Sequence, residues 1–149
     1  TYLQLVDDTR GQGRVLMYKY LTPEILSRLM ADEKCLYMTD AWIEDEGMQN
    51  PAAFSCFPEF LRLGREKGTL PHVVRQMTGA AADRFGLTGR GYLRPGFHAD
   101  VTVFDPRTAA PGPDPAGRPV GICHVFVNGE HAVKDGAALG LRAGQVLAI

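Results

Sequence analysis

Residues 35–40, Cys-Leu-Tyr-Met-Thr-Asp, form the stretch of sequence that decides the fold class. Its apolar part, residues 35–38, has the length of a short strand and ends at the polar pair Thr39-Asp40. A second apolar run, RVLMYKY, lies upstream at residues 14–20. Continuous apolar runs are typical of strands that are covered on both faces, as in parallel sheets. We therefore interpret both runs as strands of a parallel sheet.

A helix is expected between these two runs. Thr22 can cap it, Pro23 suits its first position, and Glu24 suits the positive end of the helix dipole. A strand, a helix and a second strand with short links are the βα unit of a parallel sheet, which indicates the fold class α/β.

Three further helices are predicted downstream of the second run. Thr69 and Thr78 are candidate caps for two of them, and Gly86 is a candidate stop for the last. The predicted helices cover residues 57–67, 70–77 and 79–85.

The residue pattern changes near Leu87, where short strand-like runs separated by glycines and prolines begin. We predict a domain boundary there, which gives one domain at residues 1–86 and a small β domain at residues 87–149. Asn128-Gly129 between two such runs is the strongest short-range signal for a β-hairpin. The predicted strands cover residues 99–104, 121–127 and 130–133.

The composition argues against several functional classes. The net charge of −1 comes without a basic block, so nucleic-acid binding has no electrostatic support. No apolar run approaches the roughly 20 residues of a membrane span. The 3 cysteines have no C-x-x-C spacing, and we interpret them as reduced thiols of a cytoplasmic protein. They are Cys35, Cys56 and Cys123.

Asp40 is the strongest candidate for a catalytic or metal-binding residue, because α/β folds place ligands and catalytic groups at the carboxyl ends of their strands. A carboxylate at that position can accept a proton from a metal-bound water or bind the metal itself. The alternative is that Asp40 only caps the loop after the strand. An acidic run follows Asp40: Glu44, Asp45 and Glu46. We interpret it either as a solvated loop or as a site that binds a cationic substrate group or a second ion.

The histidines do not form a recognisable metal motif. No His-x-His or His-x-x-x-His pair exists, so each histidine is expected at the surface or satisfied in the core. Asp100 follows a glycine turn and is expected to bond backbone amides of the loop at residues 94–98, a structural role. The 4 histidines are His72, His98, His124 and His131.

A family resemblance covers nearly the whole chain. YMTDAW (residues 37–42) resembles the end of the eighth barrel strand in the amidohydrolase superfamily, where a single aspartate serves as general base beside the metal. The blocks that follow are similar to the C-terminal part of the N-acyl-D-amino-acid deacylases, or D-aminoacylases. These blocks are FPEFLRLGREKGTL (57–70), VVRQMTGAAADRFGLTGRGYLRPGFHADVTVFDP (73–106), GICHVFVNGEHAVKDG (121–136) and GLRAGQVL (140–147).

The resemblance implies a fold and a reaction. Residues 1–86 would be the last βα units of a (β/α)8 TIM-type barrel, and residues 87–149 most of a small β-sandwich. The reaction would be metal-dependent hydrolysis of a linear amide, an N-acyl-D-amino acid, with Asp40 as catalytic base and as a candidate metal ligand. Zinc is the implied cofactor, and its other ligands would lie on earlier strands, upstream of this chain.

Partners and alternatives follow from the same resemblance. The chain begins with Thr1 and holds two predicted barrel strands, so we expect a fragment or processed product whose partner is the missing N-terminal barrel segment. Association with a second copy of the chain is also open. The family commonly has an arginine shortly after the aspartate; residues 50–52 contain none, and the next are Arg62 and Arg65. The rival functions are a cyclic-amide hydrolase (hydantoinase or dihydroorotase type) and a non-catalytic assembly domain.

Overall fold

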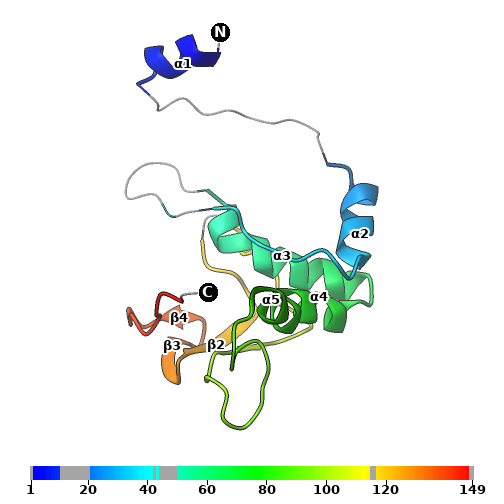
Figure 1. The fold of residues 1–149 in the computed structure, drawn as a ribbon, viewed down its shortest axis with the longest axis vertical. Helices are drawn as coiled ribbons and strands as arrows, with labels where there is room; N and C mark the ends of the chain where they lie inside the picture. Colours follow the sequence, from blue (N-terminus) through cyan, green and yellow to red (C-terminus); the bar gives the residue numbers. More distant parts are fainter. Residues whose placement is uncertain (1, 11–20, 42, 44–49, 115–116, 148–149) are drawn as a thin grey trace. The chain divides into compact units, whose positions relative to one another are not determined.

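The structure, a computed structural model, describes residues 2–10, 21–41, 43, 50–114 and 117–147. The chain divides into two units, Thr1–Met30 and Ala31–Ile149. Five helices precede a four-stranded sheet among the described residues (Figure 1). The helices are α1 (Tyr2–Asp8), α2 (Pro23–Ala31), α3 (Ala52–Glu66), α4 (Leu70–Met77) and α5 (Gly79–Phe85), and the strands are β1 (Val101–Phe104), β2 (Ile122–Val127), β3 (Glu130–Lys134) and β4 (Ala137–Ala138).

The start of α2 confirms the predicted cap. The Thr22 hydroxyl oxygen accepts a hydrogen bond from the backbone nitrogen of Ile25 at 3.3 Å, and Pro23 occupies the first helical position. The cap satisfies one of the amides that a helix start leaves unpaired, while proline has no amide to leave unpaired. Local chemistry alone therefore fixes where this helix begins.

The strand predicted at residues 35–38 is wrong. These residues have no regular secondary structure and pair with no strand among the described residues. A parallel strand is stable only with hydrogen-bonding partners alongside it, and an apolar run cannot supply them itself. The other predicted strand, at residues 14–20, lies outside the described residues.

Helix α3 begins earlier than predicted. It starts at Ala52, and Pro58 lies inside it as a buried residue. A proline inside a helix removes one hydrogen bond and is more common in the first turn, so Pro58 would fit the predicted start at Phe57 better than the observed one. The Asn50 side-chain oxygen accepts a hydrogen bond from the Ala52 amide at 3.0 Å and helps to set the true start.

Helices α4 and α5 begin and end where the sequence predicted. Thr69 and Thr78 are their N-cap residues, but neither side chain makes a capping bond; the Thr78 hydroxyl instead donates to the Val74 carbonyl at 2.8 Å. Gly86 ends α5 with a φ of 66°, the left-handed conformation expected of a glycine stop. Threonine at both positions therefore marks the helix starts without the expected bond.

The sheet is antiparallel, in the order β1-β2-β3-β4. The hairpin between β2 and β3 turns at Asn128 and Gly129, with φ values of 49° and 86°, which confirms the predicted two-residue turn. This is the one sheet among the described residues, so the barrel and the second layer of a sandwich stay predictions. The predicted boundary at residue 87 falls between α5 and β1 and also stays a prediction.

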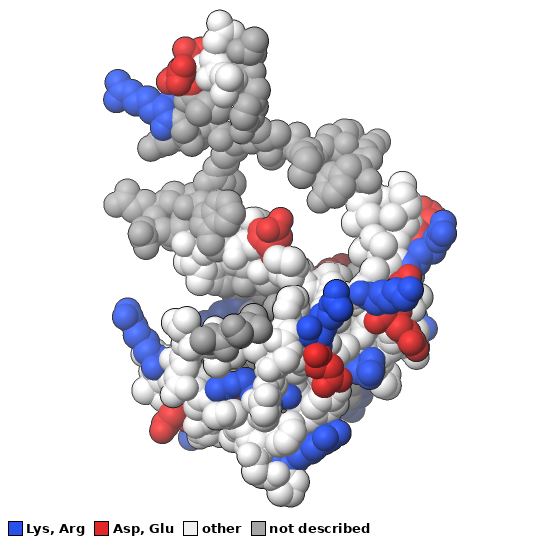
Figure 2. All heavy atoms as spheres, viewed as in Figure 1, with Lys and Arg blue, Asp and Glu red and all other residues white. Residues whose placement is uncertain are grey.

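No helix in the described ranges combines the length and the apolar character needed to cross a bilayer. Acidic and basic side chains are interspersed on the described surface that faces the viewer in Figure 2. One cluster is formed within α3, where Arg62 pairs with Glu59 at 2.5 Å and with Glu66 at 2.6 Å. This mixed pattern differs from the contiguous basic surface typical of nucleic-acid binding.

Replacing Gly129 with valine should destabilise the protein by roughly 1 kcal/mol or more, because a β-branched residue is strained at positive φ. The free energy of unfolding in urea measures this cost. Gly144→Val is the control, since Gly144 has no positive φ and a Cβ atom there would meet nothing within 4 Å. Equal losses in the two variants would contradict the turn-specific explanation.

Candidate functional site

Asp40 ends an irregular segment and not a strand, and its side chain is exposed. Its φ of 47° places it in the left-handed region, which few residues other than glycine adopt. Asparagine and aspartate tolerate this conformation better than other residues, because their short polar side chains can bond locally. The hydrogen bonds and ion pairs among the described residues include none to the Asp40 carboxylate.

Helix α3 holds the segment that leads to Asp40. The ring of Tyr37 stacks on that of Phe60, with centroids 4.5 Å apart, and the Cys56 thiol donates to the Met38 carbonyl at 3.4 Å. Burial raises the pKa of the Cys56 thiol and that of the Tyr37 hydroxyl. A raised pKa keeps Cys56 protonated at neutral pH, as a hydrogen-bond donor must be.

Helix α4 holds the same segment at its beginning. Gln76 is fully buried, with 0% of its surface exposed, although it is polar. Its side-chain nitrogen donates toward three backbone carbonyl oxygens, those of Asp32 at 3.2 Å, Glu33 at 3.0 Å and Cys35 at 2.8 Å. Two helices therefore position the segment that ends at Asp40.

The other acidic candidates, Glu44, Asp45 and Glu46, lie outside the described residues. The structure therefore leaves both interpretations of this acidic run as predictions.

Neither nearby arginine is available as an anchor for a substrate carboxylate. Arg62 is paired with two glutamates of its own helix, and these hydrogen bonds raise the pKa of the guanidinium further. Arg65 donates to the carbonyl oxygen of Ala109 at 2.8 Å and to that of Pro106 at 3.5 Å. The missing arginine at residues 50–52 is therefore not replaced by either of these two side chains.

Two histidines meet across the sheet. His131 Nε2 lies 3.3 Å from His124 Nδ1, and the His131 ring stacks on Phe126 with centroids 4.4 Å apart. The Asp135 carboxylate lies 3.9 Å from His124 Nε2. Within the described ranges, no three residues of the metal-binding types are arranged to hold an ion. The pair fits the expectation of satisfied histidines.

Asp100 has a structural role, but its predicted partners were wrong. It forms an ion pair with Arg90, and its other oxygen accepts the Asn128 backbone amide at 2.8 Å. Asn128 in turn accepts from Arg90 at 2.9 Å and donates to the Ala143 carbonyl at 2.7 Å. The carboxylate therefore binds the hairpin turn, which lies far from the loop at residues 94–98 in the sequence.

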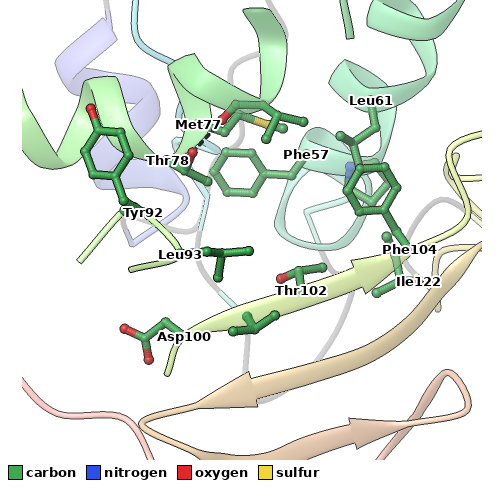
Figure 3. Close-up of a pocket in the computed structure, with 14 residues that line it drawn as sticks. Phe57, Leu61, Met77, Thr78, Tyr92, Leu93, Asp100, Thr102, Phe104 and Ile122 are labelled. Carbon is green, nitrogen blue, oxygen red and sulfur yellow. Dashed lines mark hydrogen bonds between the residues drawn. The ribbon is translucent and has the colours of Figure 1, made fainter. Parts of the chain in front are cut away.

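An apolar cavity of about 450 Å³ lies between helices α3 and α4 and strand β1 (Figure 3). Phe57 and Leu61 reach it from α3 and Phe104 from β1, while Asp100 stands at its edge. Large apolar cavities are the usual first candidates for ligand sites. Asp40 does not line this cavity, so the candidate chemistry and the cavity are at different places.

Sequence reasoning missed Gln76, although a signal for it exists. Val73 and Met77 are apolar residues of α4, and Gln76 lies three residues after the first and directly before the second. Residues three or four apart share a face of a helix, so a polar residue three after a buried valine indicates a buried polar contact. The partners of that contact are backbone atoms, which no side-chain pattern reveals.

Comparison with known proteins extends the argument from geometry. D-aminoacylase of Alcaligenes xylosoxydans xylosoxydans is 38% identical over 129 residues, which are 83% of this chain and 26% of that protein. No family model matches the chain. The chain thus spans about a quarter of the length of this curated relative.

Two solved structures are similar as well. The crystal structure of D-aminoacylase, which defines a novel subset of amidohydrolases, matches with a TM-score of 0.61 and 38% identity, over 66% of this chain and 22% of that one. N-acyl-D-glutamate deacylase from Bordetella bronchiseptica, complexed with zinc and a phosphonate mimic of the tetrahedral intermediate, matches with a TM-score of 0.69 and 32% identity, over 79% of this chain and 27% of that one.

These similarities identify the chain as a homologue of the amidohydrolases over the part that it shares with them. Within that class, the group to which it is related is that of the D-aminoacylases and N-acyl-D-amino-acid deacylases.

Proposed function

We propose that this chain is part of an amidohydrolase that cleaves the amide bond of N-acyl-D-amino acids, with Asp40 as the general base. The observation that carries the proposal is the 38% identity with D-aminoacylase over 83% of the chain. The catalytic unit would consist of this chain and the remaining three quarters that its relatives have. In that unit, residues 1–86 would complete a barrel.

A metal fits the Asp40 site in part. Zinc in a catalytic site takes about three protein ligands, and the exposed Asp40 carboxylate can supply one of them or stand beside the ion. The described residues contain no group of three such ligands, so the others would come from the rest of the catalytic unit. When bound, zinc would polarise the amide carbonyl and make water more acidic.

Asp40 would then carry out the proton transfers of the reaction. Its carboxylate takes a proton from the attacking water and delivers it to the leaving nitrogen, which departs as an amine. An exposed carboxylate is accessible to water and to substrate, as both transfers require. The contacts of the preceding residues with α3 and α4, and the left-handed backbone of Asp40, would hold its main chain in place for this role.

The test uses the complete catalytic unit, stripped of metal by chelation and then given zinc. We expect hydrolysis of N-acetyl-D-amino acids, much slower hydrolysis of the L-enantiomers, and dependence of both on the metal. Activity on hydantoins or dihydroorotate alone would replace the proposal with the cyclic-amide reaction. No activity on any of these amides, from folded and metal-loaded protein, would support the assembly domain instead.

A further inference from the structure

The buried carboxamide of Gln76 is arranged in a costly way. Its nitrogen has two hydrogens for three carbonyl oxygens, while its own oxygen is buried and accepts no hydrogen bond from the described residues. Rotating the amide by half a turn would place its oxygen against the three carbonyl oxygens and remove the hydrogen bonds that it donates to them; among the described residues, only the Asp32 carbonyl would keep another donor, the Cys35 amide at 3.1 Å. The three carbonyls therefore determine the orientation of the amide, and an unpaired buried oxygen is the result.

The helix that bears Gln76 is firmly seated on α3. Gly64 of α3 lies so close to Val73 that a Cβ atom on the glycine would stand 2.8 Å from Val73 Cγ2. Val73 itself is 0% exposed. Because Val73 and Gln76 lie three residues apart on α4, the contact that fixes the helix also fixes the base of the glutamine side chain.

Three contacts in sequence then fix the path of the segment. Gln76 holds its beginning at residues 32–35, Phe60 holds Tyr37 by stacking, and Cys56 holds the Met38 carbonyl. Asp40 follows two residues after the last of these contacts. The segment has no strand partner among the described residues. These side-chain contacts therefore hold its main chain in place of the hydrogen bonds that a neighbouring strand would supply.

We infer that Gln76 is a positioning residue for Asp40: its buried carboxamide binds the three carbonyls at the start of the segment and so places the carboxylate at its end. The inference rests on the proposed function of Asp40. Gln76 itself touches neither the carboxylate nor any reacting group. Misplacement of a catalytic group by about 1 Å can cost 10²-fold in rate. Loss of the three hydrogen bonds is therefore expected to lower the catalytic rate strongly.

The experiment uses Gln76→Met, which keeps the length and volume of the side chain but donates no hydrogen bond. Ala82→Gly is the matched control, because it weakens the neighbouring helix α5 at a buried position and leaves the Val73 contact and the carbonyl contacts of Gln76 in place. Both variants are made in the complete catalytic unit, in the parent and in the Asp40→Asn background. We measure kcat, KM and Tm, with rates taken where circular dichroism shows every variant folded.

We expect Gln76→Met to lower kcat by about 10- to 100-fold with little change in KM. Ala82→Gly should lower Tm, since glycine weakens a helix, and leave kcat within about two-fold. In the Asp40→Asn background, Gln76→Met should cost less than about two-fold, because a residue that acts through Asp40 has nothing left to position. If Gln76→Met does not fold, Gln76→Glu, which keeps one donor when protonated, takes its place.

Three results would overturn the inference: an unchanged kcat in Gln76→Met, the same loss of kcat in Ala82→Gly, or losses that multiply in the double variant. Failure of the proposed function has a different signature. There, Asp40→Asn alone turns over substrate like the parent, whatever the glutamine variant does.

Discussion

Replacing Asp40 with asparagine in the complete catalytic unit lowers kcat by about two to four orders of magnitude, the usual range for loss of a general base. Asparagine has the same size but cannot accept the proton. The fold should survive, because the side chain is exposed and asparagine tolerates a φ of 47° as well as aspartate does. Turnover and Tm, measured on the same purified variant, check both parts of this expectation.

Asp135→Asn is the matched control. Asp135 also has a positive φ, of 50°, and its side chain is exposed, but it lies in the sheet region. This variant should keep its turnover within about two-fold of the parent, since surface substitutions have small effects. If Asp40 were only a loop cap, its variant would lose about 0.5–2 kcal/mol of stability with turnover little changed. That outcome would remove the catalytic assignment.

Replacing Gly121 with alanine should destabilise the protein by about 3 kcal/mol or more, from two added costs. The first is strain, because Gly121 has a φ of 72°. The second is a clash, because a Cβ atom there would lie 2.5 Å from the backbone nitrogen of Ala109, which is 1% exposed and cannot easily move. Urea unfolding followed by circular dichroism gives the free energy.

Gly68→Ala separates the two costs. Gly68 has nearly the same φ, 69°, but a Cβ atom there would meet nothing within 4 Å. Its variant should therefore lose only about 1 kcal/mol, the cost of the left-handed conformation for alanine. A loss in the Gly121 variant no larger than this would show that the strand and the Ala109 loop move apart at little cost.

The features that the sequence predicted correctly depend on local chemistry. Helix α2 begins at its proline, α5 ends at its glycine, and the hairpin turns at Asn128-Gly129, because each choice is decided by a few neighbouring residues. The features that it missed depend on distant partners. A strand at residues 35–38 requires neighbours to pair with, and the bonds of Asp100 reach residues that lie ten and 28 positions away.

The candidate site divides in the same way. Asp40 was predicted from its position after an apolar run, and the structure places it at the end of a held segment, although that segment is not a strand. The left-handed backbone of Asp40 was not predicted, and neither were the hydrogen bonds from Gln76 to the carbonyls of residues 32–35. A single buried glutamine in an amphipathic helix gives the location of a polar contact but not its partner, which here is the main chain 41 to 44 residues upstream.

Arg65 has a consequence for how the protein opens. By donating to the Ala109 carbonyl, it ties helix α3 to the loop after β1, while Gly121 packs against the backbone of the same alanine. A fluctuation that separates helix from sheet must break this junction first. Helices α3, α4 and α5 and the sheet should therefore open as one cooperative element in native-state hydrogen exchange. This holds even though the sequence predicted a domain boundary between them. The amides of residues 109 and 120, which sit on either side of the junction, would exchange at the rate of global unfolding.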